Sequence, residues 1–164
     1  PFEDKRMHSQ KEFHADIAMT LGGYVAEEMV FKDLTTGPSN DLQVLTNLAR
    51  NMVTRWGMSK KVGPIALESE SGKPMYGIPG GDKEYSQEVA ATVDKEVAKI
   101  INDGKKEAKK ILTKHKGALD AIAERLIEVE TIEREEFEKL LIEHGITPKK
   151  KEDIEHSPLP GEEQ

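Results

Sequence analysis

Five histidines are the side chains in this sequence best suited to metal binding or acid–base catalysis. A helical His-Glu-x-x-His motif places two imidazole ligands on one helix face with a glutamate base between them, but no two histidines here have that spacing. His8 and His14 are six residues apart, so on a helix they face different directions. The sequence therefore predicts solvent-exposed histidines and no complete zinc site. The five are His8, His14, His115, His144 and His156.

Among the acidic residues, Asp41 has the most informative position. It follows a Thr-Thr-Gly-Pro segment, residues 35–38, and opens a run with helical periodicity. An aspartate in the first turn of a helix gains about 0.3–1 kcal/mol from the helix dipole, which explains Asp41 without any catalytic or metal-binding role. The consecutive Glu27 and Glu28 point in different directions on a helix and are expected on its wet surface.

Several other kinds of site are excluded by what the sequence lacks. It contains no cysteine, which rules out thiol catalysis, disulfides and thiolate zinc ligands. Gly80-Gly81 with Lys83 is the nearest approach to a phosphate-binding loop, but the Gly-Lys-Ser/Thr ending is missing. The formal charge of −7 disfavours nucleic acid as a partner, because phosphates attract clustered lysine and arginine. We therefore expect no catalytic residue and no nucleotide-binding residue.

The first element that would position Asp41 is an amphipathic helix. Ser9 and Glu12 have the capping-box spacing that satisfies free N–H groups at a helix start. Gly22-Gly23 lies within the helical pattern, where the pair either permits close packing against a neighbour or breaks the helix. The apolar stripe consists of Phe13, Ile17, Leu21, Val25 and Met29.

A second helix is predicted from Asp41, with Ser39 and Asn40 as capping residues and Gly57 as its stop. Its stripe consists of Leu42, Leu45, Leu48, Ala49, Met52, Val53 and Trp56. Two short apolar runs, residues 65–67 and 75–78, then predict a small β hairpin, because glycines and prolines surround them.

Three further helices complete the predicted fold. The first begins near Ser86 and is weakly interrupted at Gly104, the second follows Gly117, and Thr131 caps the third, which ends at Gly145. The fold class is therefore mainly α, with a small β hairpin and a C-terminal antiparallel helix array, over residues 1–147. Residues 148–164 are charged and poor in apolar side chains, which predicts a disordered tail.

Three segments, taken in order, resemble one known family. Residues 21–28 (LGGYVAEE) are similar to its Leu-Gly-Gly-Arg-x-Ala-Glu-Glu segment, and residues 35–42 (TTGPSNDL) to its Thr-Thr-Gly-Ala-x-Asn-Asp-Leu loop. Residues 47–57 (NLARNMVTRWG) continue in register, and residues 130–132 (ETI) also fit. The family is FtsH, in which a hexameric AAA+ ATPase is joined to a zinc peptidase. The resemblance covers residues 7–145 and implies a part of the peptidase domain.

The resemblance implies a metal-ligand role for Asp41. In the family, zinc is held by the two histidines of a His-Glu-x-x-His helix and by a downstream aspartate, and Asp41 matches that aspartate. The His-Glu-x-x-His helix lies further upstream in the family and is absent here, so the chain alone is expected to be inactive. Tyr24 replaces the usual arginine and is expected to alter a local ion pair. Pro38 replaces the usual alanine and should stiffen the loop.

The resemblance also implies the setting of the longer protein. That protein would be a homo-hexamer, degrade unfolded and membrane proteins, and carry ATP and Mg on its ATPase domain. Its N-terminal anchor would hold it at the inner membrane with the peptidase on the cytoplasmic side. No stretch of 18 apolar residues and no signal peptide is present, so the chain itself is expected to be soluble.

Two other interpretations remain open at this point. The chain begins with Pro1 and not with methionine, which favours a processed or excised fragment. A natural truncated paralogue that acts as a non-catalytic helical oligomerisation or interaction module is the main alternative. An unrelated helical partner-binding domain is the third interpretation, because amphipathic stripes are common.

Overall fold

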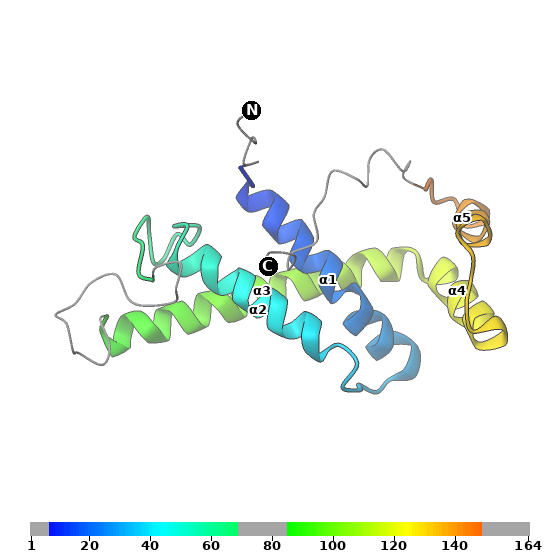
Figure 1. Ribbon diagram of the computed structural model, residues 1–164, viewed down its shortest axis with the longest axis horizontal. Coiled ribbons are helices and arrows are strands. Elements are labelled where there is room, and N and C mark those ends of the chain that lie inside the picture. The colour runs from blue at the N-terminus through cyan, green and yellow to red at the C-terminus, as the bar shows by residue number, and fades with distance from the viewer. Residues whose placement is uncertain (1–6, 69–84, 149–164) are drawn as a thin grey trace, which may run out of the picture.

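The computed structural model describes residues 7–68 and 85–148, which contain five helices (Figure 1). This confirms the predicted mainly α fold. In chain order they are α1 (Gln10–Phe31), α2 (Ser39–Thr54), α3 (Gln87–Lys114), α4 (Lys116–Val129) and α5 (Arg134–Glu143). None of the helices in these ranges is both long and apolar enough to cross a membrane.

The predicted capping box starts α1. The Glu12 backbone N–H donates to Ser9 Oγ at 3.2 Å, and the Glu12 side chain accepts from the Ser9 backbone. The helix then continues unbroken through Gly22-Gly23, so a break, one of the two alternatives that the sequence left open, is wrong. Close packing is not the reason for the pair either, because a Cβ added at either glycine would meet no atom within 4 Å.

The start of α2 differs from the prediction. The helix begins at Ser39, so Ser39 and Asn40 lie inside its first turn and do not cap it. Pro38 is the N-cap residue and makes no side-chain capping bond. Its φ of −74° is close to the value that the proline ring fixes. The predicted stop is confirmed: α2 ends at Thr54, and Gly57 then adopts φ +63°, which favours glycine.

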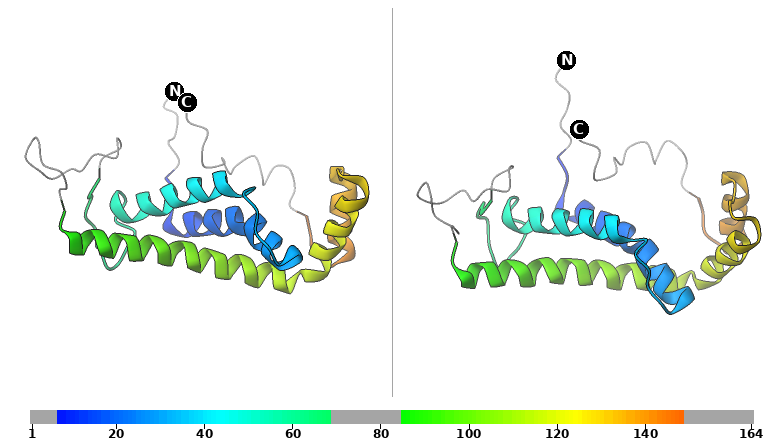
Figure 2. Two further views of the ribbon diagram at one scale, coloured as in Figure 1. Left: turned by 90° about the horizontal axis from the view of Figure 1, so that it is seen from below. Right: turned by 60° about the horizontal axis from the view of Figure 1, so that its bottom comes forward.

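The core lies between α1, α2 and α3. Figure 2 shows α1 and α2 on the same side of α3, which extends past both. The side chains buried between them are aliphatic or methionine and include Ile17, Leu21, Val25, Leu45, Ala49, Met52, Val53, Val93 and Ile100. The predicted stripes of the first two helices therefore form most of the core.

Gly104 is a glycine that allows close packing between α1 and α3. The predicted interruption of the helix is wrong, because α3 runs unbroken through this residue. Gly104 is buried, and a Cβ there would lie only 2.7 Å from Ile17 Cγ2 and 3.4 Å from Leu21 Cδ1. The missing side chain thus lets α1 approach α3 at the centre of the core.

The C-terminal helices form an antiparallel pair. A Cβ at Gly117 in α4 would lie 3.3 Å from the His144 ring just beyond α5, and Arg125 in α4 pairs with Glu136 in α5. Residues early in α4 thus lie beside residues at the end of α5, which is the arrangement of an antiparallel pair. Figure 1 shows the pair at one end of α3. Only α4 and α5 of the predicted three-helix array therefore pack side by side, and α3 instead belongs to the core with α1 and α2. The predicted Thr131 cap is also wrong: Glu133 is the N-cap of α5.

The predicted β hairpin is not found in the described residues. Its first arm, residues 65–67, is irregular and lies beside the end of α2, where the Leu67 and Glu68 backbone N–H groups both donate to the Thr54 carbonyl. Its second arm, residues 75–78, lies outside the described residues, as do residues 149–164 of the predicted tail. The predicted stop at Gly145 is confirmed by its φ of +73°.

Candidate metal-ligand loop

Residues 32–38 connect α1 to α2 and lead directly to Asp41. Lys32 leaves α1 in the left-handed conformation, with φ 54°. Local hydrogen bonds then shape the loop: the Gly37 N–H donates to Thr35 Oγ1 at 3.2 Å, and the Ser39 N–H donates to the Thr36 carbonyl at 3.1 Å. These bonds set the direction in which α2 begins.

Glu27 and Glu28 have separate partners. The Glu27 carboxylate accepts a hydrogen bond from the Thr35 backbone N–H at 2.9 Å and so joins α1 to the loop. The Glu28 carboxylate pairs with Lys105 of α3 at 3.1 Å. Their different directions agree with the prediction, but neither is simply solvated surface. The Lys105 ammonium also lies 5.1 Å from the centroid of the Tyr24 ring, a cation–π contact at the position where the family has arginine.

Asp41 itself is an exposed carboxylate in the first turn of α2. It forms no hydrogen bond or ion pair with any other residue that the structure describes. Its oxygens are therefore available, and a carboxylate oxygen is a normal zinc ligand. The position fits one ligand of a metal site. It does not supply a complete one, since a catalytic zinc needs three protein ligands.

The histidines do not add the missing ligands. The His8 ring lies 5.6 Å from that of Phe13, and His144 Nδ1 lies 2.8 Å from the Leu140 carbonyl. Both side chains are exposed, as predicted, whereas His14 and His115 are partly buried. Across residues 7–68 and 85–148, no group of three or more His, Cys, Asp or Glu side chains could hold a metal ion. His156 lies outside these ranges.

A polar cluster lies at the opposite end of α2 from Asp41. The Glu68 carboxylate pairs with Arg50 at 2.6 Å and accepts from the Tyr85 hydroxyl at 3.0 Å and the Thr54 hydroxyl at 3.2 Å. Burial raises the pKa of Glu68, but the hydrogen bonds from Arg50 and Tyr85 outweigh burial and hold the pKa below its ordinary value. The bond to Glu68 raises the pKa of Arg50. This cluster stabilises the fold and has no link to Asp41.

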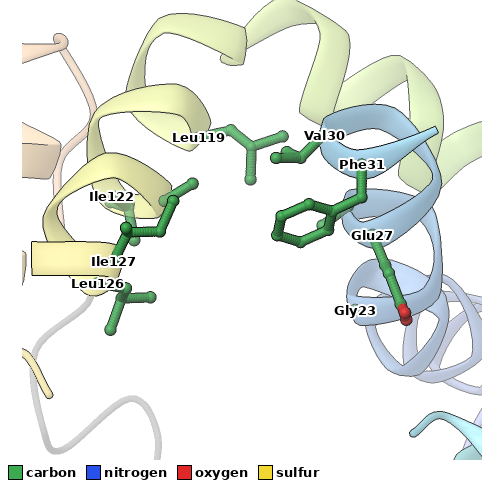
Figure 3. Close-up of a pocket in the computed structure, with 10 residues that line it drawn as sticks. Gly23, Glu27, Val30, Phe31, Leu119, Ile122, Leu126 and Ile127 are labelled. Carbon is green, nitrogen blue, oxygen red and sulfur yellow. The ribbon is translucent and has the colours of Figure 1, made fainter. Parts of the chain in front are cut away.

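An apolar groove of about 480 Å³ separates the second half of α1 from α4. Figure 3 shows side chains of the two helices facing each other across it, with the Glu27 carboxylate directed away from α4. Phe31 and Ile127 are 65% and 73% exposed at its edges. Exposed apolar surface of this kind is typical of contact sites for other apolar groups. The lining residues are Gly23, Ala26, Glu27, Val30, Phe31, Leu119, Ile122, Ala123, Leu126 and Ile127.

Residues 1–140 match the model of peptidase family M41. The chain belongs to this family. It is 40% identical over 147 residues to ATP-dependent zinc metalloprotease FtsH 3 of Synechocystis, a match that covers 86% of the chain and 24% of the relative. It is 42% identical over 141 residues to FtsH of Mycobacterium tuberculosis, covering 85% and 19%, and 40% identical over 152 residues to FtsH of Bacillus subtilis, covering 92% and 24%.

Membership of M41 confirms the resemblance to FtsH and excludes the interpretation as an unrelated helical domain. The chain spans about a quarter or less of the length of these relatives. The structure shows that two of the family-like segments are in contact. Residues 21–28 supply Glu27, residues 35–42 supply Thr35 and Asp41, and the hydrogen bond between Glu27 and Thr35 joins them.

Sequence reasoning missed the hydrogen bond between Glu27 and the loop. Its neighbour Glu28 has the same side chain, and helical periodicity alone gives neither residue a partner. The available signal was the occurrence of the glutamate pair in one family-like segment just before the loop of the other. Which of the two glutamates faces the loop depends on the path of residues 32–38 and requires the structure.

Proposed function

We propose that the chain forms part of the zinc peptidase of an ATP-dependent protease and that Asp41 supplies one zinc ligand. The observation that carries the proposal is the exposed Asp41 carboxylate, which has no competing partner in the described residues and follows a loop tied to α1. The M41 match and the names of the relatives support the reaction class.

In this proposal the chain supplies only part of the active site. Two histidine ligands and the glutamate base come from an upstream segment that this sequence does not contain. A zinc ion held there would supply Lewis-acid chemistry: it would lower the pKa of a coordinated water toward 7 and polarise the scissile carbonyl. The contribution of this chain is the Asp41 oxygen, together with a loop and helix that fix its direction.

The longer protein is proposed to work as a homo-hexamer on protein substrates, including unfolded and membrane proteins. ATP and Mg belong to its ATPase domain, and an N-terminal anchor holds it at the inner membrane with the peptidase on the cytoplasmic side. The relatives named as ATP-dependent zinc metalloproteases support the ATP dependence and the protease activity within this proposal. It is tested by expressing the full-length product of the gene and measuring ATP-stimulated degradation of an unfolded protein.

The isolated chain is expected to bind almost no zinc. A single exposed carboxylate cannot replace the hydration shell of the ion, because a stable site needs several converging ligands. The measurement is elemental analysis of zinc per chain after equilibration with the metal, on the wild type and on Asp41→Ala. Near-zero zinc in both is the expected result. One zinc per wild-type chain that is lost in Asp41→Ala would contradict this expectation and show that the chain builds a complete site from its own residues.

The isolated chain is also expected not to cleave casein. No His-Glu-x-x-His glutamate is present to accept a proton from a zinc-bound water. The assay uses labelled casein with zinc added, and the full-length gene product serves as the positive control. Cleavage by the isolated chain that a chelator abolishes would contradict the proposed division of the active site.

The alternative function is a non-catalytic helical interaction module from a truncated paralogue. The apolar groove between α1 and α4 favours it. The genomic codons before Pro1 discriminate between the two functions. A reading frame that continues upstream into a His-Glu-x-x-His motif and a P-loop supports the protease, and a nearby start codon supports the module.

A further inference from the structure

Charge is distributed unevenly between α3 and the two helices that follow it. Residues 95–116 contain eight lysines and only three acidic residues, whereas residues 120–143 contain nine acidic residues and only three basic ones. The whole chain has a formal charge of −7, so the lysine-rich segment is an exception in it. The two segments carry opposite net charges of similar size, which makes their surfaces electrostatically complementary.

The lysines form a basic face on the outside of α3. Figure 2 shows α1 and α2 on one side of α3, and the buried Gly104 and Ala108 mark that side of the helix. Lys106 lies midway between these two residues, and a helix turns about 100° per residue, so Lys106 points to the opposite side. The basic face consists of six exposed residues, Lys95, Lys99, Lys106, Lys109, Lys110 and Lys114.

An acidic row of Asp120, Glu124 and Glu128 lies on the outside of α4. The three residues are four positions apart, so their side chains follow one another along the helix at intervals of about 6 Å. Glu124 and Glu128 are exposed, and Asp120 is partly exposed. Ile122, which lines the apolar groove toward α1, lies midway between Asp120 and Glu124 in the sequence. The acidic row therefore faces away from α1.

Within one chain the acidic row cannot reach the basic face. His115 is the one residue between α3 and α4, whereas two helices need a connection of about 2–5 residues to run back alongside each other. Figure 2 shows α4 and α5 rising from the end of α3 toward the side that α1 and α2 occupy. Across residues 7–68 and 85–148, no ion pair joins α3 to α4 or α5. A complementary surface must therefore come from another molecule.

We propose that the basic face of α3 in one copy of the chain binds the acidic row of α4 in a second copy. Lys106, Lys110 and Lys114 also recur every four residues, so the two rows have the same repeat along their helices. The contact joins two different surfaces and is therefore head-to-tail. Such a contact can repeat from copy to copy, and it closes into a ring when the rotation between copies allows.

The charged groups of both surfaces have weak partners or none within the chain. Lys109, Lys114 and Glu124 form no ion pair with any residue in the part of the chain that the structure describes. Lys106 and Lys110 lie 3.9 Å and 3.7 Å from acidic neighbours in their own helix, and the other two acids of the row pair with cations of α4 itself. Exposed pairs of this kind contribute little, so a second copy competes with them easily.

Each surface also has an exposed isoleucine beside it. Ile111 lies three residues before Lys114 and is 49% exposed, and Ile127 lies three residues after Glu124 and is 73% exposed. Residues three apart are neighbours on the surface of a helix. A contact between the two rows can therefore remove apolar surface from water in addition to pairing charges.

The inference concerns contacts between copies of the chain and not the zinc site. It rests on the proposed function in one respect, since the head-to-tail contact would lie between neighbouring subunits of the proposed homo-hexamer. Its test uses neither zinc nor protease activity. Failure of the test would therefore leave the proposed zinc-ligand role of Asp41 unaffected.

The first measurement is sedimentation equilibrium of the chain of 164 residues in about 50 mM and about 500 mM NaCl. We expect self-association at low salt that is at least about tenfold weaker at high salt, because salt screens exposed charges. A chain that stays monomeric at low salt would overturn the proposal. So would association that salt does not weaken, which would point instead to the apolar groove between α1 and α4.

Charge reversal then tests which surfaces meet. Lys109→Glu with Lys114→Glu changes the basic face, and Glu124→Lys with Glu128→Lys changes the acidic row. Each double variant is expected to associate at least about tenfold more weakly, because like charges then face each other. An equimolar mixture of the two should recover the association, as should one chain with all four substitutions, whose net charge equals that of the wild type. Recovery also shows that the substitutions leave the fold intact.

Lys11→Glu with Lys60→Glu is the matched control. Both lysines are exposed and lie outside α3 and α4, and the variant has the same net charge as the variant of the basic face. It should keep the association of the wild type. An equal loss in the control and in the variant of the basic face would assign the effect to net charge and overturn the proposal. Absence of recovery in the chain with all four substitutions would also overturn it.

Discussion

Replacement of Gly104 by valine is expected to lower the free energy of unfolding by about 3 kcal/mol, at the upper end of the usual cost of overpacking a core. The new Cβ would lie 2.7 Å from Ile17 Cγ2, inside van der Waals contact. Ile17 is completely buried and β-branched, so it has little freedom to move aside. The strain must separate α1 from α3, which form the largest contact in the fold. Chemical denaturation of the wild type and the variant measures the difference.

Gly22 supplies the matched control for this prediction. It also lies inside a helix, but a Cβ there meets no atom within 4 Å. Gly22→Ala is therefore expected to stabilise the protein by about 0.5–1 kcal/mol, the usual gain when alanine replaces glycine within a helix. Gly104→Val at wild-type stability would show that α1 and α3 are not packed as closely as the structure places them.

The different roles of these glycines show which features of the fold can be predicted from local sequence. Ser9 with Glu12, and Ser86 before α3, form capping bonds within three residues, and both helix starts were predicted correctly. The role of a glycine depends instead on what lies across from it. Gly104 lies against Ile17, which is far away in sequence, so periodicity alone predicted a weak interruption where the structure packs α1 closely against α3.

The N-caps that were predicted wrongly also depend on parts of the structure that lie outside the local sequence. Ser39, Asn40 and Thr131 have side chains that favour N-cap positions. The path of the chain nevertheless decides which of several neighbouring residues becomes the N-cap. Pro38 and Glu133 occupy those positions instead, without side-chain capping bonds. Both sit where a short connection must turn from one helix into the next, and the packing of these helices fixes the turn.

In the candidate site, likewise, the sequence predicted the local feature and missed the contact between separate segments. Resemblance to FtsH was enough to single out Asp41, because the loop before it is a continuous segment of sequence. The hydrogen bond from Thr35 to Glu27 was not predictable, since it depends on the left-handed exit at Lys32 that turns the chain back along α1. A lysine at positive φ leaves no recognisable signal in the sequence.

Replacement of Glu68 by alanine is expected to lower the free energy of unfolding by about 2–3 kcal/mol at neutral pH. The Glu68 side chain is only 11% exposed, and its loss removes the acceptor for Arg50, Tyr85 and Thr54 at once. Loss of one partner of a fully buried ion pair costs about 3–5 kcal/mol. The lower figure applies because Arg50 is 41% exposed and regains hydration when its partner is lost.

The stabilisation from Glu68 is expected to disappear in acid. Because the cluster holds the pKa of Glu68 below its ordinary value, the folded state favours the ionised carboxylate. The contribution is therefore complete above the ordinary glutamate pKa of about 4.3 and is lost as the pH falls from there through the lowered folded value. Urea denaturation at pH 7 and at successive values below 5 should show the stability of Glu68→Gln approaching that of the wild type. A constant difference across this range would mean that the shape of the side chain, and not its charge, stabilises the cluster.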